Sequence, residues 1–440
     1  MKYYSTNGKA PIADLHKAVV KGLAEDRGLY MPEKINKLPK EFFDNIEKMS
    51  FQEIAYTVAS AFFGEDVDPD ALHDIVYDTL QFDCPVVNVK DNIYTLELFH
   101  GPTLAFKDVG ARFMARLLQY FIKQENNHKE VNVLVATSGD TGSAVANGFL
   151  GVDGIHVYVL YPKGKVSPIQ ECQFTTLGKN ITAIEVDGVF DDCQALVKNA
   201  FMDAELNEHM KLTSANSINV ARFLPQAFYY FNAYARMKEI ANTQHLSPNT
   251  QLVMCVPSGN FGNICAALFG HEMGLPIKRF IAANNANDIF YNYLQTGKYE
   301  PKPSKQTLAN AMDVGDPSNF ARIYDLYGKS HAKITSLISG ATYSDEQIKA
   351  TMRECYKDSG YILDPHGACG YQALKDGLQA GEVGVFCETA HPAKFKEKVD
   401  DILGIDVEIP ERLAAFMRGQ KQSVPMSKDF ANFKDYLMRQ

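Results

Sequence analysis

The sequence predicts an α/β fold in which two doubly wound units follow a helical unit. Continuous apolar runs such as VNVLVAT and IHVYVLYP alternate with helical stretches from about residue 131. This alternation is typical of a parallel sheet that helices cover on both faces. It resumes at QLVMCVP, residues 251–257. A length of 440 residues agrees with about three structural units.

We expect the three units to follow one another along the chain. The first, residues 1–84, mixes helical patterns such as IADLHKAVVKGL with loops. The second, residues 85–245, contains the strands VNVLVAT, IHVYVLYP and ITAIEV and ends in the amphipathic stretch VARFLPQAFYYFNAYARMKEI. The third, residues 246–440, contains the strands QLVMCVP, IKRFIAAN and VGVFCET, with an irregular insertion at about residues 290–345.

Composition and charge exclude several classes of protein. The chain has no run of about 18 apolar residues that could span a membrane, and its start, MKYYSTNGKAPIADLHKAVVKG, lacks the apolar region of a signal peptide. A net charge of −9 argues against binding to nucleic acids or anionic membranes. We therefore expect a cytoplasmic protein without a nucleic-acid or membrane partner, as a monomer or else a dimer.

The cysteines suggest neither disulfides nor a metal site. The chain has eight cysteines, scattered without a CxxC pair or a neighbouring histidine at metal-ligand spacing. Most lie in apolar runs such as LVMCVP and VGVFCET. We interpret them as reduced, buried thiols and predict no bound metal.

Two loops between a strand and a helix are candidate anion sites, because ligands of open α/β folds bind beyond the carboxyl ends of the strands. The loop 137–142, TSGDTG, precedes a helix expected near Ser143. Its small residues and the helix N-terminus suit a carboxylate or a phosphate, although an ordinary capped turn explains the loop equally well.

The second loop, residues 258–263 with the sequence SGNFGN, follows the strand QLVMCVP. It suits phosphate better, because several successive backbone amides can converge on one anion. It lacks the GK[ST] ending of a Walker A loop and does not fit GxGxxG. Nucleotide hydrolysis and NAD binding therefore lose support.

A lysine in an unfavourable position is the third feature. Lys107, in HGPTLAFKD, is expected in the first turn of the helix that continues as VGARFMARLLQYF, where a cation opposes the helix dipole. It is either a solvated surface lysine beside Asp108 or an amine whose pKa is lowered so that it can form a Schiff base.

These motifs together resemble a known family. HGPTLAFKD, TSGDTGSA, SANSINVAR, VPSGNFGN, LDPHGA and ETAHPAKF occur in this order and closely resemble the threonine synthases, which are pyridoxal-phosphate (PLP) enzymes. The likeness extends over essentially the whole chain, and DRGLYMP is similar to the bacterial and fungal branch. It implies fold type II, the tryptophan synthase β-like fold. It also implies a lyase of threonine biosynthesis that converts O-phospho-L-homoserine and water into L-threonine and phosphate by γ-elimination and β-addition of water.

The resemblance assigns the cofactor site residue by residue. Lys107 matches the lysine that binds PLP as a Schiff base, and it is the one residue we class as catalytic. Thr389, in ETAHP, matches the hydroxyl that contacts the pyridine nitrogen and leaves it unprotonated. The residues that match the loop around the cofactor phosphate are Ser258, Gly259, Asn260, Phe261, Gly262 and Asn263.

The resemblance also assigns a substrate site. The TSGDTG loop is similar to the carboxylate-binding loop of cysteine synthases, so the substrate carboxylate is expected at its amides, Ser138 and Thr141. Asp140 replaces an Asn of those enzymes, and its role stays open. The remaining residues assigned to the substrate are Thr103, Ser214, Asn216, Asn219 and Arg222.

Some assignments have alternatives. One arginine with Asn and Ser donors in SANSINVAR suits a phosphate ester, but turn and cap chemistry by Asn219 with a snorkelling Arg222 fits the residues as well. His366 and His391 are interpreted as loop and turn residues outside the catalytic set.

Two other functions fit the same fold. A threonine or serine dehydratase would share the lysine and the phosphate loop, but it needs no site for a phosphorylated side chain, and SANSINVAR therefore argues against it. A non-catalytic protein that binds a phosphorylated metabolite is disfavoured by the presence of Lys107.

Overall fold

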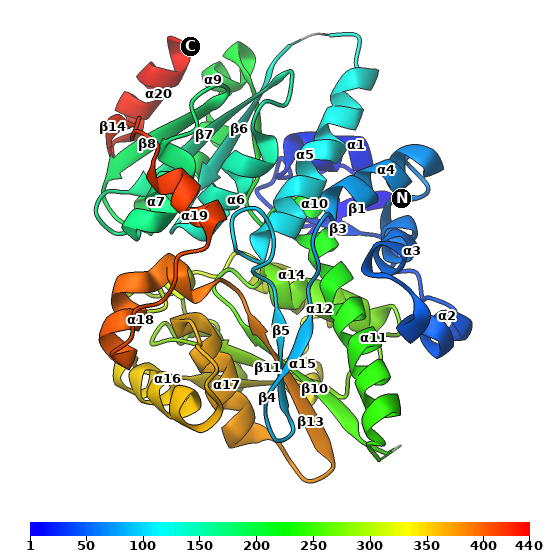
Figure 1. Ribbon diagram of the computed structural model, residues 1–440. Helices are drawn as coiled ribbons and strands as arrows, with labels where there is room; N and C mark the ends of the chain where they lie inside the picture. Colours follow the sequence, from blue (N-terminus) through cyan, green and yellow to red (C-terminus); the bar gives the residue numbers. More distant parts are fainter. Residues whose placement is uncertain (128, 248) are drawn as a thin grey trace. The chain divides into compact units, whose positions relative to one another are not determined.

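The chain folds into two compact units, each built from segments that are distant in the sequence. The structure is a computed structural model that describes residues 1–127, 129–247 and 249–440 (Figure 1). The first unit consists of Met1, Pro32–Phe106 and Phe223–Glu408. The second unit consists of Lys2–Met31, Lys107–Arg222 and Ile409–Gln440.

A six-stranded sheet forms the centre of the first unit, in the order β12-β11-β10-β13-β5-β4. Strand β4 runs antiparallel to β5, and the other four pairs are parallel. The strands are β4 (Val86–Lys90), β5 (Ile93–Glu97), β10 (Gln251–Pro257), β11 (Arg279–Asn284), β12 (Ile338–Thr342) and β13 (Glu382–Glu388).

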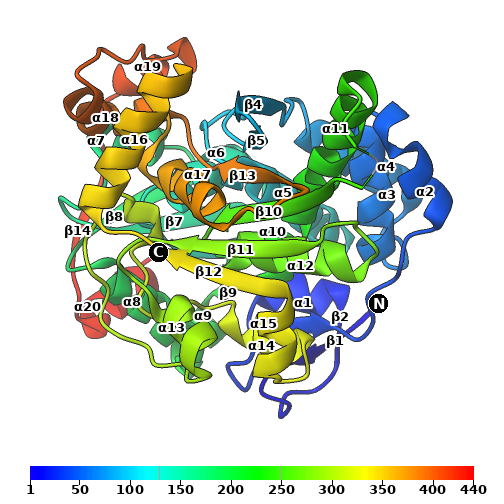
Figure 2. The ribbon, with the colours of Figure 1, turned by 90° about the horizontal axis from the view of Figure 1, so that it is seen from below.

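Helices cover both faces of this sheet. Figure 2 shows α17 (Pro365–Gly377) on one face and α12 (Gly262–Glu272) on the other. Helix α11 (Ala227–Gln244) packs along α12 and α3 (Phe51–Phe63). The unit also contains α2 (Lys40–Asn45), α4 (Pro69–Thr79), α13 (Ile289–Thr296), α14 (Phe320–Leu326), α15 (His331–Leu337), α16 (Asp345–Ser359) and α18 (Lys396–Leu403).

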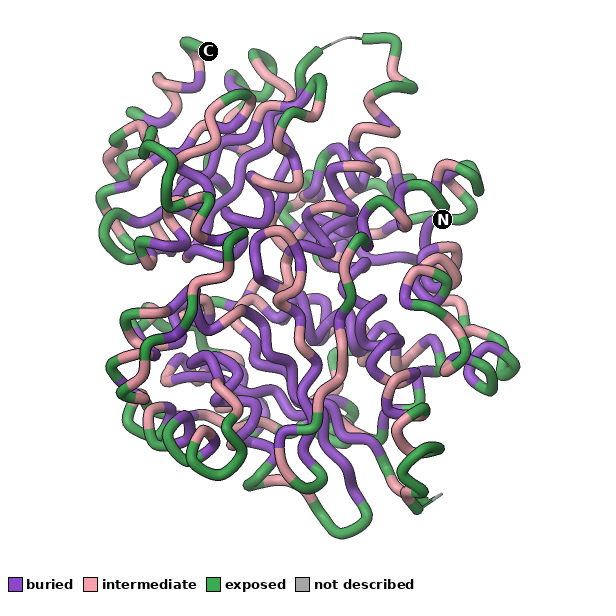
Figure 3. Tube along the Cα trace, in the orientation of Figure 1, coloured by how far each residue is buried: buried purple, intermediate pink, exposed green. Residues whose placement is uncertain are grey.

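A five-stranded parallel sheet forms the centre of the second unit, in the order β14-β8-β7-β6-β9. Its strands are β6 (Val131–Ala136), β7 (Ile155–Pro162), β8 (Ile181–Asp187), β9 (Lys211–Ser214) and β14 (Val424–Ser427). Every residue of β6 is buried, as expected for a strand that is covered on both faces. The buried strands of both sheets are visible in Figure 3.

The helices of the second unit surround its sheet. They include α1 (Leu15–Lys21), α5 (Lys107–Gln124), α6 (Asp140–Phe149), α7 (Pro168–Thr175), α8 (Phe190–Met202), α9 (Ala204–His209), α19 (Glu411–Met417) and α20 (Phe430–Met438). A small sheet near the N-terminus of the chain joins β1 (Lys2–Ser5), β2 (Ala13–Asp14) and β3 (Tyr30–Pro32).

The six apolar runs predicted as strands are β6, β7, β8, β10, β11 and β13, and the α/β fold class is confirmed. The stretch VARFLPQAFYYFNAYARMKEI is interrupted: α10 (Val220–Phe223) and a 3₁₀ turn at Leu224–Gln226 precede α11. Pro225 lies in that turn, where it has no backbone N–H to continue the helix.

The observed units differ from the consecutive ranges 1–84, 85–245 and 246–440. Strand β5 pairs with β13, and β4 pairs with β5, so neither strand joins the sheet of β6. The sequence pattern of a strand does not indicate which strand is its partner. The stretch at 290–345 is also more regular than expected. It contains α13, α14, α15 and the edge strand β12.

The eight cysteines are free thiols, of which seven are buried and Cys172 is partly exposed. Among the described residues, no cluster of three or more His, Cys, Asp or Glu side chains could hold a metal ion. No helix in the described part of the chain is both long and apolar enough to cross a bilayer.

Candidate active site

The loop 258–263 joins β10 to the buried helix α12, as predicted. Phe261 is the N-cap of α12 and has a φ of 65°, a left-handed conformation that costs free energy for a residue with a side chain. Its ring packs against Phe290 with 4.6 Å between the centroids. Packing therefore holds the loop in a conformation that it would not adopt alone.

The side chains of Ser258 and Asn263 stabilise the conformation of the loop 258–263. The Ser258 hydroxyl donates to Oδ1 of Asn263 at 3.0 Å, and Nδ2 of Asn263 donates to the carbonyl oxygen of Pro257 at 2.8 Å. From β11, Nδ2 of Asn284 donates to the carbonyl oxygen of Ser258 at 3.0 Å. The side chains of Ser258 and Asn263 thus fix the backbone, which leaves the backbone itself as the ligand-binding element.

The backbone amides of this loop are available to a ligand. Within the described ranges, the N–H groups of residues 259–263 donate to no other protein atom. The backbone of Gly259 also packs closely against Ala311. A Cβ on Gly259 would lie 2.7 Å from the carbonyl oxygen of Ala311, so this contact restricts the loop. Successive amides at a helix N-terminus are the arrangement that binds phosphate.

The TSGDTG loop leads into α6, which begins at Asp140, three residues before the expected Ser143. The hydroxyl of Thr137 accepts hydrogen bonds from the backbone N–H groups of Gly139 at 2.9 Å and Gly142 at 2.7 Å. These bonds fold the loop back on the end of β6. The helix therefore starts directly within the motif.

Asp140 is buried in this loop, with 1% of its surface exposed. Its Oδ1 accepts a hydrogen bond of 2.9 Å from Nε2 of Gln170. The same glutamine contacts the backbone closely, because a Cβ on Gly139 would lie 2.6 Å from the Gln170 side chain. Gln170 thus holds Asp140, a function that the sequence did not indicate, and the φ of 139° at position 139 favours a glycine there.

Lys107 is the first residue of α5, so its predicted position in the first turn is confirmed. Lys107 is partly buried and Asp108 is 1% exposed, which argues against a solvated pair on the surface. The segment before Lys107 is also constrained. Leu104 is buried with a φ of 59°, a strained conformation for a residue with a branched side chain.

The segment before Lys107 pairs with the segment that contains Thr389. The backbone N–H of Phe106 donates to the carbonyl oxygen of Thr389 at 2.8 Å, and the N–H of His391 donates to the carbonyl oxygen of Leu104 at 3.0 Å. Nζ of the buried Lys394 donates to the carbonyl oxygen of Thr103 at 3.0 Å. The HGPTLAFKD and ETAHPAKF motifs therefore meet in the folded chain.

The SANSINVAR segment follows β9, and its asparagines bind the backbone. Asn216 accepts from the N–H of Ala136 at 3.1 Å and donates to the carbonyl oxygen of the same residue at 2.8 Å. Asn219 donates to the carbonyl oxygens of Val19 at 2.9 Å and Ser214 at 3.1 Å. Asn219 therefore stabilises the turn, as the alternative interpretation predicts, whereas Asn216 binds the end of β6.

Arg222 does not snorkel, because only 1% of its surface is exposed. Its Nε donates to the carbonyl oxygen of Ala215 at 2.8 Å. A Cβ on Gly110 of α5 would lie 2.4 Å from its Nη1. The guanidinium is thus fixed between the turn and α5.

A buried acid and histidine cluster lies beside Thr389 and was not predicted. Nδ1 of His366 lies 2.5 Å from Oδ2 of Asp364, and Nε2 of His366 accepts from the backbone N–H of Ala311 at 3.1 Å. Nε2 is therefore an acceptor, so Nδ1 carries the proton that is donated to Asp364. LDPHGA is the signal for this cluster in the sequence, and the expectation of a loop residue at 366 is wrong because His366 lies in the first turn of α17.

Glu388 completes this cluster. Its Oε1 accepts from the backbone N–H of Asp364 at 2.7 Å. Burial and the neighbouring Asp364 carboxylate raise the pKa of Glu388 well above its usual range. A Cβ on Gly367 would lie 1.7 Å from Oε2 of Glu388, which explains the glycine in LDPHGA.

His391 stabilises a turn. Its Nδ1 accepts from the backbone N–H of Ala393 at 3.0 Å at the start of a 3₁₀ turn, Pro392–Phe395. Burial, with the charge of His100, lowers the pKa of His391 to about 4. His391 is therefore neutral at pH 7 and acts as an acceptor.

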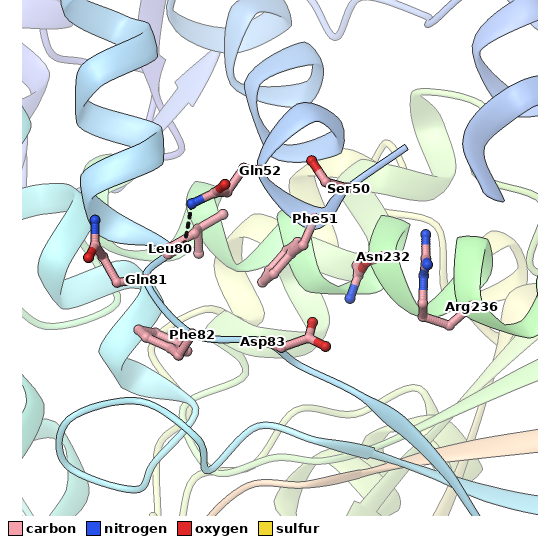
Figure 4. A pocket seen from close by; sticks show the side chains of 9 residues that line it. All are labelled: Ser50, Phe51, Gln52, Leu80, Gln81, Phe82, Asp83, Asn232 and Arg236. Carbon is pink, nitrogen blue, oxygen red and sulfur yellow. Dashed lines mark hydrogen bonds between the residues drawn. The ribbon is translucent and has the colours of Figure 1, made fainter. Parts of the chain in front are cut away.

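A separate cavity of about 600 Å³ opens in the first unit between α3, the loop after α4, and α11 (Figure 4). Among the residues that line the cavity, Gln52 donates a hydrogen bond from Nε2 to the carbonyl oxygen of Leu80 at 2.8 Å. The amide oxygen of Asn232 is buried in its wall. The lining contains none of the site residues predicted from the sequence.

Comparison with known proteins defines the class. Residues 82–387 match the family model "Pyridoxal-phosphate dependent enzyme". Residues 2–80 match "Threonine synthase N terminus", and residues 367–437 match "Threonine synthase, C-terminal". The protein is therefore a pyridoxal-phosphate-dependent enzyme of fold type II.

Full-length relatives define the family. The chain is 43% identical to the threonine synthases of Serratia marcescens and Escherichia coli over 438 residues, which cover 100% of this chain and 99% of each relative. The chain belongs to the threonine synthase family. The crystal structure of the E. coli threonine synthase matches with a TM-score of 0.93 and 100% coverage of both chains. A PLP-bound threonine synthase from Brucella melitensis matches at 34% identity, a TM-score of 0.89, and 100% and 99% coverage.

Proposed function

We propose that the protein converts O-phospho-L-homoserine and water into L-threonine and phosphate, with Lys107 as the catalytic residue. The observation that carries this proposal is the pairing of residues 104–106 with residues 389–391. It brings the segment that ends at Lys107 to the segment that contains Thr389. Full-length identity to threonine synthases favours this reaction over that of a dehydratase.

The residues present fit the cofactor. The unpartnered amides of residues 259–263 suit its phosphate, and a neutral threonine hydroxyl at 389 suits a pyridine nitrogen that stays unprotonated. When bound, PLP withdraws electrons from the Cα atom of an amino-acid substrate. In the proposed site Lys107 binds the cofactor covalently, and the loop 258–263 holds its phosphate.

The chain's own groups then carry out binding and proton transfer. We assign the substrate carboxylate to the backbone N–H groups at the start of α6, with Ser138 and Thr141. The Nζ atom of Lys107 moves protons at Cα and Cβ of the substrate. Exclusion of bulk water protects the reacting atoms from premature protonation.

The phosphate of the substrate requires a positive charge. Because Asn216 and Asn219 are already bonded to the backbone, we assign the main attraction to the guanidinium of Arg222, and we keep Ser214 and Thr103 as the further hydroxyl donors. A buried guanidinium binds a phosphate ester strongly, since its donors match the phosphate oxygens.

The reaction is tested by following phosphate release and L-threonine formation from O-phospho-L-homoserine with purified protein. Both products in equal amounts support the proposal, whereas a ketoacid with ammonia would identify a dehydratase. We further propose a cytoplasmic protein that is a monomer, or else a dimer. Light scattering after gel filtration measures that state.

A further inference from the structure

The loop 258–263 is braced by α14, an element of the segment expected to be irregular. Asn319, the N-cap of α14, donates two hydrogen bonds to the carbonyl oxygen of Asn260. One comes from its backbone N–H at 3.1 Å and the other from Nδ2 at 3.1 Å. Arg322 then donates from Nη1 to Oδ1 of Asn319 at 2.8 Å. The three residues form a continuous chain of hydrogen bonds from the helix to the loop.

Arg322 is a fully buried cation. Both Arg322 and Asn319 are 0% exposed, and the guanidinium carbon of Arg322 lies 4.1 Å from the centroid of the Phe223 ring. Burial lowers the pKa of Arg322 to about 9, so the group remains charged at neutral pH. Burying a guanidinium costs free energy, and hydrogen bonds such as the one to Asn319 offset part of that cost.

The bracing sets the direction of the loop amides. In a trans peptide the C=O and the next N–H point in opposite directions, and no described peptide bond is cis. Because Asn319 holds the carbonyl of Asn260, the N–H of Phe261 is directed away from α14. Because Asn284 holds the carbonyl of Ser258 at 3.0 Å, the N–H of Gly259 is directed away from Asn284. Two of the free amides are thus oriented by asparagine side chains.

We propose that Arg322 is a positioning residue for the cofactor phosphate. Through Asn319 it fixes the carbonyl of Asn260 and so the amide of Phe261, and its buried charge stabilises the phosphate dianion. A charge in a low-dielectric interior acts more strongly than the same charge in water. The inference rests on the proposed function, in which the loop 258–263 holds that phosphate.

The test compares PLP with pyridoxal, which lacks the phosphate, on the full-length protein after its cofactor has been removed. Arg322→Met keeps an apolar stem but removes the charge and the donors. It should weaken PLP binding by roughly tenfold to a hundredfold and leave pyridoxal binding unchanged. Inorganic phosphate should raise the melting temperature of the cofactor-free parent protein but not that of the variant. The PLP affinity of Arg322→Lys should lie between those of the parent protein and Arg322→Met.

A matched control separates positioning from general stability. Arg279 begins β11 and binds Glu382 at 2.7 Å, at the opposite end of the strands from the loop. Arg279→Met should lower the melting temperature but leave the ratio of PLP to pyridoxal affinity unchanged. If Arg322→Met does not fold, Asn319→Ala tests the same series of hydrogen bonds from Arg322 to Asn260. It should lower the ratio of PLP to pyridoxal affinity by less than the factor expected for Arg322→Met.

Three results would overturn the proposal. Arg322→Met could lose affinity for PLP and pyridoxal equally, which would indicate a general structural role. It could bind both as well as the parent protein does. Finally, the parent protein could bind pyridoxal as tightly as PLP. In that case the loop 258–263 is not a phosphate site, and the cofactor assignment itself fails, independently of Arg322.

Discussion

The backbone N–H of Phe106 donates a hydrogen bond of 2.8 Å to the carbonyl oxygen of Thr389. Phe106 immediately precedes Lys107, and Thr389 is the residue proposed to contact the pyridine nitrogen of the cofactor. An antiparallel bridge between Ala105 and Ala390 extends the pairing. The backbone that leads into the proposed catalytic lysine is therefore anchored on the segment that carries its proposed partner.

Lys394 should hold this pairing in place. Lys394→Met removes the hydrogen bond from Nζ to the buried carbonyl oxygen of Thr103, and loss of a charge-assisted hydrogen bond costs about 1.5–3 kcal/mol. We expect a lower melting temperature and lower turnover, because Leu104 is strained and its segment is then less constrained. The control is Lys349→Met, which breaks a pair with Glu346 on the surface of α16 and should change little. Equal melting temperatures for the two variants would contradict the role of Lys394.

Gly262 should be needed for cofactor binding. It is the first residue of α12, and its amide is one of those without a protein partner. Gly262→Val adds a branched side chain at the start of the helix, which blocks the approach of a phosphate to the backbone. Retention of PLP after dialysis, measured by absorbance, should fall sharply. Unchanged retention would show that the phosphate binds elsewhere.

Glu388 should make the stability of the protein depend on pH. Its pKa is raised in the folded state, so its contribution is fully present below the unfolded pKa of about 4.3 and is lost as the pH rises through the folded pKa. Glu388→Gln keeps an acceptor for the N–H of Asp364 and removes the titration. Relative to the parent protein, the variant should gain up to about 1.4 kcal/mol of unfolding free energy per pH unit as the pH rises from the unfolded pKa toward the raised folded pKa. Urea unfolding at several pH values measures this, and parallel pH curves would refute it.

Arg222 should be required for the phosphorylated substrate. Loss of a charge-assisted hydrogen bond costs about 1.5–3 kcal/mol, so Arg222→Ala should lower kcat/KM for O-phospho-L-homoserine by roughly tenfold to a hundredfold. Side reactions with L-serine should suffer much less. Because Arg222 also binds the carbonyl of Ala215, a thermal melt is the control. An equal loss with both substrates would indicate a purely structural arginine.

The sequence predicted six of the strands, β6, β7, β8, β10, β11 and β13, but not the partners that join them in the two sheets. Apolar runs identify buried strands such as β13, whereas the pairing of β13 with β5 depends on contacts between residues almost 300 positions apart. The order of the motifs along the chain therefore indicated the family, whereas the division of the chain into its two compact units could be seen only in the structure.

Individual side chains of the site were also only partly predictable. Asn216 and Asn219 have the donors of a phosphate site, yet both bind the backbone, because residue type alone does not reveal which partner is nearer. The role of Gln170 beneath Asp140 and the pair of Asp364 with Glu388 depend on contacts across 30 and 24 residues. No local pattern in the sequence encodes such contacts.

The central claim is that Lys107 binds the cofactor covalently and carries out catalysis. Borohydride reduction of the purified protein, followed by peptide mapping, tests it most directly, with Lys107→Ala as the matched control. We predict a pyridoxyl group on Lys107 in the parent protein, no label at this position in the variant, and loss of turnover even where the variant still retains PLP. A pyridoxyl group on another lysine of the parent protein, or full activity of Lys107→Ala, would contradict the account.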